Sequence, residues 1–277
     1  MKKVNFLFCL FLLLTNHLSA QELKMLWETD STLKVPESVF LDANNQRLYV
    51  SNIDGKNAWE KDGKGSISLL TLSGKILNPN WITGLHAPKG MSMFQDFLIV
   101  ADVDSVVIID VVKGQVIKKI FVEGAKALND VVCNKRGDMY VTDSKENKVF
   151  MVDAMKLTPE LYLEGLSGVN GITYADKTLY IVDAGGLFRI GKNKEKIKVA
   201  DGMDGRTDGV EMIDENNFIV SCWEGAVWHV KSNGEKKLLW DAKKEVYNTA
   251  DIGIDRKTQT LYVPTFWRNT VRAYKWN

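Results

Sequence analysis

The chain has 277 residues, of which 45% are hydrophobic and 26% are charged, and its formal net charge is +1. This is the composition of a folded globular protein rather than of a disordered chain. Its basic residues are scattered and form no run that would attract nucleic acid or an anionic membrane surface. We therefore expect neither nucleic acid nor a membrane among its partners.

The first twenty residues have the features of a secretory signal peptide. Lys2 and Lys3 precede an apolar run at residues 6–14, which is too short to span a bilayer. The sequence therefore predicts a signal peptide at residues 1–20 and a mature domain at residues 21–277, located in the periplasm or secreted from the cell.

Two cysteines, Cys133 and Cys222, remain outside this signal segment. Both lie in strand-like runs that belong to different parts of a repeating pattern. We expect two free thiols rather than a disulfide, because residues so placed are poorly positioned for a bond between them.

Six segments of the chain share one pattern, in which a polar residue with Gly or Pro leads to an apolar strand, a turn and a second strand. Apolar residues alternate with a period of two and Val, Ile and Tyr dominate, which indicates strands rather than helical repeats. The second strands recur every 39 to 50 residues, with centres at Tyr49, Ile99, Tyr140, Tyr180, Ile219 and Tyr262. This spacing is typical of a β-propeller with four-stranded blades.

The two ends of the repeat array complement each other. The last repeat stops after its third strand, whereas residues 23–27 (LKMLW) are similar to the expected fourth strand KLLW at residues 237–240. The predicted fold is therefore all-β: a six-bladed β-propeller whose ring is closed by an N-terminal strand that completes the last blade. The first repeat also carries a polar, Gly-rich insertion at residues 53–66, either a lid over one face or a long solvated loop.

Each repeat has one polar residue at the start of its first strand, and in a propeller these strands line the central channel. Turn chemistry would explain any one of these residues, particularly in an Asn-Gly or Asp-Gly pair. As a set they bring three acidic side chains to one axis, where they repel unless a cation lies among them. The six residues are Glu37, Lys89, Asn129, Asn170, Asp208 and Asp251.

A divalent ion held by oxygen atoms of Glu37, Asn170 and Asp208 would balance this charge. Oxygen ligands suit calcium, magnesium or manganese better than zinc or copper. Calcium is the expected cofactor, with magnesium, manganese and zinc as alternatives.

The segments ESVFLD, LNDVV, VNGITYADKTLYIVD and TDGVEMID resemble those of the gluconolactonase, regucalcin (senescence marker protein) and luciferin-regenerating-enzyme family. The resemblance spans essentially the whole mature chain and implies a six-bladed propeller with a divalent metal on its axis. It places the metal ligands at Glu37, Asn170 and Asp208, and a substrate-binding residue at Asn129.

The chain also departs from that family. Val39 stands where the family commonly has Pro, and Pro36 precedes the Glu instead. Ala127 stands where the members that act on sugar lactones carry an Arg that contacts the substrate. Lys89 or Arg206 would have to supply the missing positive charge, so the kind of lactone stays open.

These residues predict a secreted, metal-dependent hydrolase that acts on a small molecule, a lactone or a related ester. The metal would polarise the carbonyl group and activate water, and Asp208 would accept a proton from that water. Asn129 and Lys89 would bind the substrate. The chain contains no G-x-S-x-G nucleophile motif, and no specific protein partner is expected.

The competing interpretation is a non-catalytic propeller of the NHL-repeat type that binds a ligand or a protein. Two histidines are expected to be structural: His86 in a loop and His229 in a third strand. Three aromatic residues, Trp223, Phe266 and Trp267, follow second strands, where packing between blades is the expected role and a hydrophobic wall for a substrate is the alternative.

Overall fold

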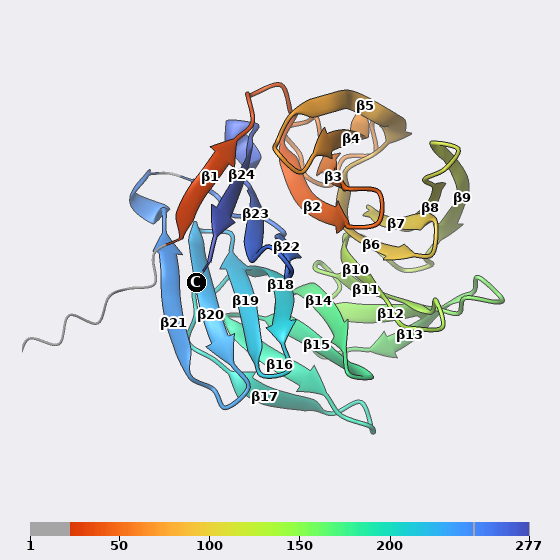
Figure 1. The fold of residues 1–277 in the computed structure, drawn as a ribbon. Coiled ribbons are helices and arrows are strands. Elements are labelled where there is room, and N and C mark those ends of the chain that lie inside the picture. The colour runs from red at the N-terminus through yellow and green to blue at the C-terminus, as the bar shows by residue number, and fades with distance from the viewer. Residues whose placement is uncertain (1–22, 246, 277) are drawn as a thin grey trace, which may run out of the picture.

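The computed structural model describes residues 23–245 and 247–276, so the predicted signal peptide lies outside the described residues. The strands in these ranges form six four-stranded antiparallel sheets arranged as blades around a central axis (Figure 1). The predicted six-bladed β-propeller is confirmed. The short 3-10 helices η1 (Lys243–Glu245) and η2 (Phe266–Arg268) lie in loops. No helix in this part of the chain is long and apolar enough to cross a membrane.

The four strands of each blade follow one another from the axis outward. The innermost strands are β2 (Pro36–Asp42), β6 (Pro88–Phe94), β10 (Leu128–Cys133), β14 (Val169–Ala175), β18 (Thr207–Asp214) and β22 (Gly253–Asp255). The second strands are β3 (Arg47–Asn52), β7 (Phe97–Asp102), β11 (Met139–Asp143), β15 (Thr178–Asp183), β19 (Asn217–Cys222) and β23 (Thr260–Pro264). The third strands are β4 (Gly65–Thr71), β8 (Ser105–Asp110), β12 (Lys148–Val152), β16 (Gly186–Ile190), β20 (Ala226–Lys231) and β24 (Val271–Lys275). The outer strands are β5 (Ile76–Leu85), β9 (Gln115–Phe121), β13 (Pro159–Leu163), β17 (Lys196–Ala200), β21 (Lys236–Asp241) and β1 (Lys24–Glu28).

The N-terminal strand closes the ring, as predicted. Strand β1 pairs antiparallel with β24 and lies beside it in Figure 1. The Trp27 ring lies 5.9 Å from that of Tyr262, and in the first blade the outer-strand Trp81 lies 5.0 Å from Tyr49. Trp27 therefore fills the fourth-strand position of the last blade, although it comes from the other end of the chain.

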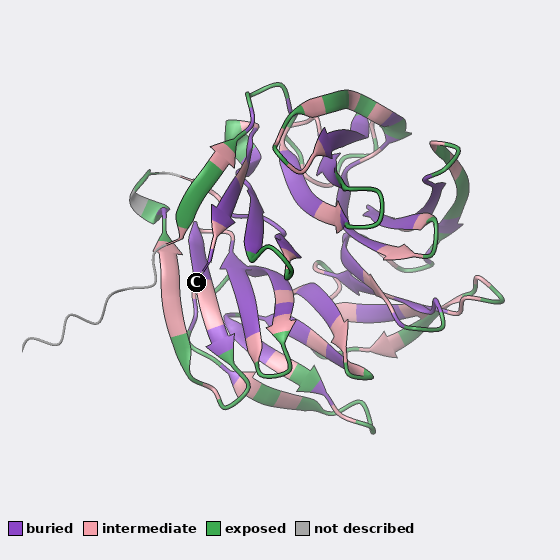
Figure 2. Cartoon of the chain, in the orientation of Figure 1, coloured by how far each residue is buried: buried purple, intermediate pink, exposed green. Residues whose placement is uncertain are grey.

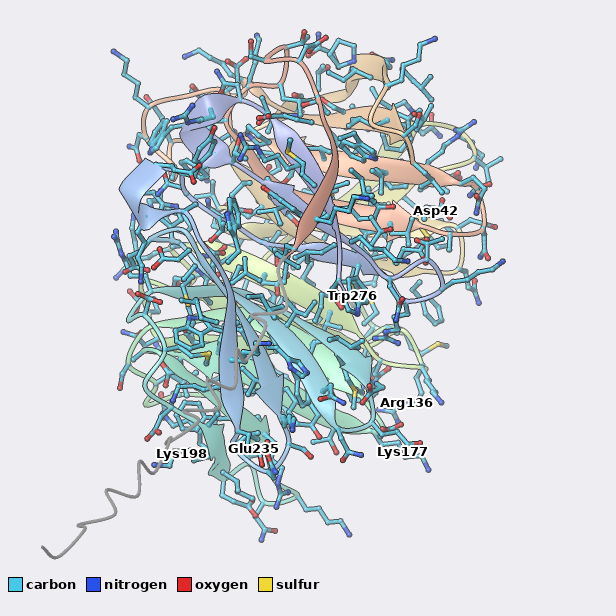
Figure 3. The ribbon with its side chains drawn as sticks, turned by 60° about the vertical axis from the view of Figure 1, so that its left-hand side comes forward. Asp42, Arg136, Lys177, Lys198, Glu235 and Trp276 are labelled. Atoms are coloured by element: carbon cyan, nitrogen blue, oxygen red, sulfur yellow. The ribbon has the colours of Figure 1, made fainter. Side chains whose placement is uncertain are left out.

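The hydrophobic core lies between the blades. In the described part of the chain, six clusters each join two neighbouring blades, and one of them packs Val50 of the first blade against Tyr262 of the last. The second strands are buried on both faces, which is why they read as nearly continuous apolar runs. Burial falls off toward the outer strands (Figure 2), and charged side chains such as Arg136, Lys177 and Glu235 extend from the turns that join the strands of a blade (Figure 3).

The two cysteines are free, as predicted. Cys222 is fully buried on β19 and Cys133 is half-buried on β10. Burial raises the pKa of the Cys133 thiol to about 12, so it stays protonated and unreactive at neutral pH.

Candidate functional site

The polar residues predicted at the axis lie where the innermost strands lose register with the second strands. Such irregularities are β-bulges or related breaks, and they redirect the side chains that they contain. Breaks fall between Pro36 and Ser38, Pro88 and Met91, Leu128 and Val131, Val169 and Ile172, and Thr207 and Val210. They contain Glu37, Lys89, Asn129, Asn170 and Asp208.

The glycines that follow Asn170 and Asp208 are inside strands and not in turns. A Cβ atom on Gly171 would lie 2.2 Å from the carbonyl oxygen of Asp208, and one on Gly209 would lie 2.5 Å from Asp251 Oδ1. These glycines allow neighbouring inner strands to approach each other closely. Turn chemistry therefore does not account for the Asn-Gly and Asp-Gly pairs.

The five redirected side chains line one cavity of about 500 Å³ at the axis. Asp251 was expected at the same level, and this expectation was wrong. Its backbone N–H donates to the Glu37 carbonyl at 2.9 Å and its Oδ2 accepts from Ser38 Oγ at 2.6 Å. These bonds place Asp251 in a deeper cavity of about 150 Å³.

Two carboxylates of the axial cavity are buried with an oxygen atom left unpaired. Glu37 and Asp208 are each 3% exposed. The Lys89 ammonium lies 3.4 Å from Glu37 Oε1, but Glu37 Oε2 and Asp208 Oδ1 have no hydrogen-bond partner among the described residues. Since an unpaired buried carboxylate oxygen is costly, the cavity is suited to a group that supplies positive charge.

The pKa values of the acids along the axis also indicate an excess of buried negative charge. Burial raises the pKa of Glu37, although the Lys89 charge opposes the shift. Burial, followed by the charges of Glu37 and Asp251, raises the pKa of Asp208 well above its usual range. Burial also raises the pKa of Asp130 and Asp251 well above theirs. The axis therefore carries more acid than Lys89 alone balances, and either protons or a bound cation would relieve it.

The predicted ligand set fits a divalent ion with oxygen ligands. Glu37, Asn170 and Asp208 line the same cavity, and two of them have the unpaired oxygen atoms. Among the described residues, no three His, Cys, Asp or Glu side chains form a ready-made metal centre, so the third protein ligand would be the Asn170 amide oxygen. Two carboxylates and an amide oxygen are hard ligands of the kind that calcium and magnesium accept.

Asn129 and Lys89, the predicted substrate-binding residues, are held in place at the cavity. The Asn129 amide donates to Ser144 Oγ at 2.9 Å, and that hydroxyl donates to the Val169 carbonyl at 2.8 Å. The Lys89 ammonium lies 4.3 Å from the centre of the Trp59 ring. Both residues can therefore present polar atoms to a ligand from fixed positions.

The insertion of the first repeat contributes to the cavity through Ala58 and Trp59. It spans residues 53–64, because β4 already begins at Gly65. The backbone N–H of Gly63 donates to His86 Nδ1 at 3.2 Å, which gives His86 the loop role expected of it. Sequence reasoning missed Trp59, for which a Trp in a polar, Gly-rich loop was the available signal.

The three aromatic residues expected to pack between blades also line the axial cavity. Phe266 is buried beside Ile53 and Ala87, whereas Trp267 is 49% exposed. Packing is therefore only part of their role. Trp223 lines the cavity as well, so these residues form a hydrophobic boundary next to the polar floor, which consists of the five redirected side chains.

The two positions considered for the missing positive charge differ in structure. Ala127 is fully buried and is not among the residues that line the cavity. Arg206 lines it, but its Nε donates to Glu224 Oε1 at 2.8 Å and its guanidinium lies 4.5 Å from the Trp223 ring. Lys89 therefore supplies the cation next to the buried acids.

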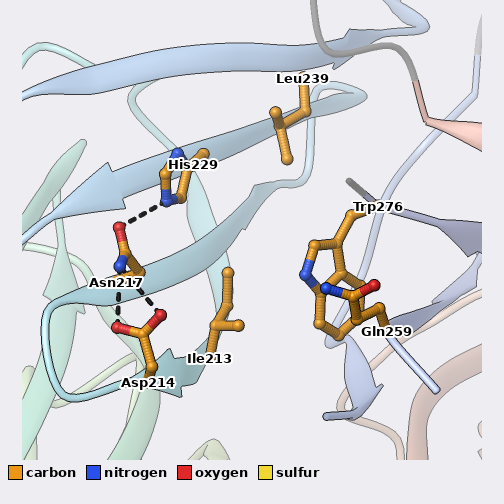
Figure 4. Close-up of a pocket in the computed structure, with 7 residues that line it drawn as sticks. All are labelled: Ile213, Asp214, Asn217, His229, Leu239, Gln259 and Trp276. Carbon is orange, nitrogen blue, oxygen red and sulfur yellow. Dashed lines mark hydrogen bonds between the residues drawn. The ribbon is translucent and has the colours of Figure 1, made fainter. Parts of the chain in front are cut away.

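His229 lies away from the axis, as expected, in a separate cavity of about 250 Å³ (Figure 4). Its Nε2 lies 2.8 Å from Asn217 Oδ1, and the Asn217 amide donates to both oxygens of Asp214. Because Asn217 Oδ1 must then accept, the His229 Nε2 carries a proton. This chain of bonds links neighbouring strands of the fifth blade and supports a structural role.

Glu211 of the deeper cavity gives a pH-dependent prediction. Burial raises its pKa from 4.5 to about 7, although the Arg256 charge opposes the shift. The folded state then holds the proton more tightly than the unfolded state, so stability falls as pH rises from about 4.5 to about 7. We expect Glu211→Gln to raise the Tm by several degrees at about pH 8, at about 2–4 °C per kcal/mol, and to change it much less at about pH 5. An equal shift at both pH values in a thermal melt would contradict this prediction.

Comparison with known proteins establishes the fold alone. The sequence matches no protein-family model and no curated protein. Among solved structures, it is similar to a structural-genomics protein assigned to the gluconolactonases, with 14% identity, a TM-score of 0.68, and 94% of this chain and 93% of that chain covered. It is also similar to a chain of a nidogen/laminin complex, with 16% identity, a TM-score of 0.67, and coverage of 80% and 85%. A streptogramin B lyase follows, with 11% identity, a TM-score of 0.66, and coverage of 92% and 97%. The chain thus shares its propeller fold with proteins of several different functions.

Proposed function

We propose that the protein is a metal-dependent hydrolase of a lactone or a related ester. The observation that carries this proposal is the pair of unpaired, buried oxygen atoms, Glu37 Oε2 and Asp208 Oδ1, in one axial cavity. The resemblance to the gluconolactonase family, and a protein of the same fold assigned to the gluconolactonases, support the same reaction class.

The residues of the cavity floor would bind the ion, accept a proton or position the substrate. Glu37, Asn170 and Asp208 would hold the ion, which when bound polarises a carbonyl group and lowers the pKa of water. Asp208 would accept the proton of the attacking water, and Asn129 and Lys89 would orient the substrate. The water oxygen bonds to the carbonyl carbon, the ring C–O bond breaks, and the proton passes to the leaving alkoxide, which yields a hydroxy acid.

We propose calcium as the ion and the periplasm or the cell exterior as the location. The predicted site has only two carboxylates, and sites of low charge bind calcium weakly, with a Kd of about 10⁻⁴–10⁻³ M in extracellular modules. The predicted signal peptide gives the location, and both assignments rest on the sequence.

A second candidate function is a propeller that binds a small ligand without catalysis. The ion pair between Lys89 and Glu37, at 3.4 Å, favours it because the ammonium already places one positive charge beside the acids. A protein-binding role has fold-level precedent in the similar chain from a nidogen/laminin complex.

The test is hydrolysis of a lactone panel by the purified protein before and after removal of divalent ions with a chelator. We expect activity to disappear with the chelator and to return with calcium, magnesium, manganese or zinc, most fully with calcium. Asp251→Asn is the matched control, since Asp251 lies in the deeper cavity, and it should keep ion-dependent activity. A protein that binds ions but hydrolyses no lactone would favour the ligand-binding alternative.

A further inference from the structure

The mouth of the axial cavity carries an aromatic wall that the proposed chemistry does not use. It consists of Trp59 from the loop between β3 and β4, Trp223 from the turn after β19, and Phe266 and Trp267 from η2. These side chains come from the first, fifth and sixth blades, which are neighbours in the closed ring. They therefore border one side of a cavity whose floor is polar.

Three of the four rings of the wall, those of Trp223, Phe266 and Trp267, pack against one another. The Phe266 ring contacts Trp223 at 5.9 Å and 76°, and Trp267 at 4.8 Å and 84°. These are edge-to-face contacts, in which the faces of some rings stay available. Arg206 covers Trp223 from another direction at 4.5 Å. The wall is thus formed before any ligand binds.

The backbone of η2 is held in an unfavourable conformation to present these rings. Phe266 has a φ of 48°, which a bulky side chain rarely adopts. Asn269 secures the turn, since its N–H donates to the Phe266 carbonyl at 3.0 Å and its Oδ1 accepts from the Val35 N–H at 2.9 Å. Strained residues fixed in this way cluster at ligand sites.

The wall also leaves apolar surface uncovered. Trp267 is 49% exposed even though its ring is fixed against Phe266. A ligand that covered this apolar surface would be stabilised in proportion to the area removed from water. An exposed Trp that packs against a buried Phe at the mouth of a cavity therefore favours binding of an apolar group.

Two polar groups next to the wall, the Arg206 Nε–H and the Asn129 amide N–H, already have partners. Arg206 donates to Glu224 at 2.8 Å, and Ser144 Oγ lies between the Asn129 amide and the Val169 carbonyl. A hydroxyl group placed against the aromatic rings themselves would lose water and gain few hydrogen bonds in return.

We propose that the aromatic wall binds an aryl substituent of the substrate, so that aryl-substituted lactones or esters are preferred over polyhydroxylated sugar lactones. This inference rests on the proposed function, because it concerns the substrate class of the same site. The polar floor takes the lactone carbonyl, and the aryl group lies against Trp267 and Trp223.

Three five-membered lactones test the proposal: γ-butyrolactone, its γ-phenyl derivative and ribono-γ-lactone. We expect kcat/KM to be at least about tenfold higher for the phenyl lactone than for the other two. In Trp267→Ala the ratio of phenyl to unsubstituted lactone should fall toward one, mainly through a higher KM, and Trp267→Phe should restore part of it. Phe121→Ala is the control, because Phe121 is 61% exposed on the outer strand of the second blade, and it should keep the ratio.

A binding measurement separates this inference from the proposed function. The lactam analogue of the phenyl lactone resists hydrolysis, and its binding can be followed by calorimetry beside that of the unsubstituted lactam. Selective binding of the phenyl lactam that Trp267→Ala weakens would support the wall even if no lactone is hydrolysed, in which case the proposed function alone fails. Hydrolysis without a preference for the phenyl lactone would overturn the proposed aryl-binding role of the wall and leave the hydrolase proposal standing. A ratio of phenyl to unsubstituted kcat/KM that stayed unchanged in Trp267→Ala would do the same. If the protein neither bound the phenyl lactam nor hydrolysed any lactone, both the aryl-binding inference and the proposed function would be overturned.

Discussion

Asp208→Asn should abolish hydrolysis and at the same time stabilise the ion-free protein at neutral pH. Loss of a residue that only supports a metal ligand already costs 10- to 100-fold in affinity or activity, so we expect a drop in kcat/KM of more than about 100-fold. The stabilisation arises because Asp208 is 3% exposed and its Oδ1 lacks a partner. Asn keeps the shape of the side chain and removes the charge.

The sign of the stability change follows from the pKa of Asp208, which lies well above its usual 3.8 in the folded state. Its contribution to stability is present below about pH 3.8 and is lost as pH rises through the folded-state pKa. With a chelator present, Asp208→Asn should therefore raise the Tm by several degrees at about pH 8, at about 2–4 °C per kcal/mol, and by less at about pH 5. Added calcium should stabilise the wild type more than the variant. A lower Tm for the chelated variant would show that stabilising contacts of the Asp208 carboxylate outweigh the cost of its buried charge.

Lys89→Met should destabilise the ion-free protein, the opposite of the effect expected for Asp208→Asn. Lys89 is 2% exposed and its ammonium lies 3.4 Å from Glu37 Oε1. Removal of one partner of a buried ion pair leaves an uncompensated charge, which typically costs about 3–5 kcal/mol of unfolding free energy. Chemical denaturation with a chelator should show this loss, and calcium should restore most of it because the ion supplies charge beside Glu37.

Lys61→Met is the matched control for Lys89→Met. The Lys61 ammonium pairs with Asp104 at 2.6 Å, but the Lys61 side chain is 50% exposed. Exposed ion pairs contribute about 0–1 kcal/mol, so the control should change stability little. If calcium failed to rescue Lys89→Met, the ammonium would be a permanent part of the site and the ligand-binding alternative would gain support.

The architecture was predictable from the sequence because each blade repeats the same local pattern. Period-two alternation and the spacing of the second strands determine which segments form blades, and the predicted third strand at residues 148–152 coincides with β12. The similarity between the N-terminal strand and KLLW predicted how the ring closes, which Trp27 confirms through its contact with Tyr262. These features depend on local patterning and on the need to pair every strand.

The site was only partly predictable because its details depend on where strands begin and how loops fold. Asp251 shares the sequence offset of Asp208, but its bond to Ser38 Oγ turns it toward the deeper cavity. Trp59 reaches the cavity through the conformation of a long loop, which no periodic pattern encodes. The roles of Trp223 and Phe266 combine packing and lining, and the sequence alone offered these as alternatives. The bound ion, its identity and the cellular location remain predictions.

Calorimetric titration of calcium into chelator-treated wild-type protein, Asp208→Asn and Asp251→Asn tests the central claim most directly. If the axial cavity is a divalent-cation centre, the wild type and Asp251→Asn should each bind one ion per chain, and Asp208→Asn should bind none. Parallel titrations with magnesium, manganese and zinc would identify the preferred ion. Absence of binding in the wild type would contradict the cation centre and leave a propeller whose buried acids are balanced by protons and by Lys89.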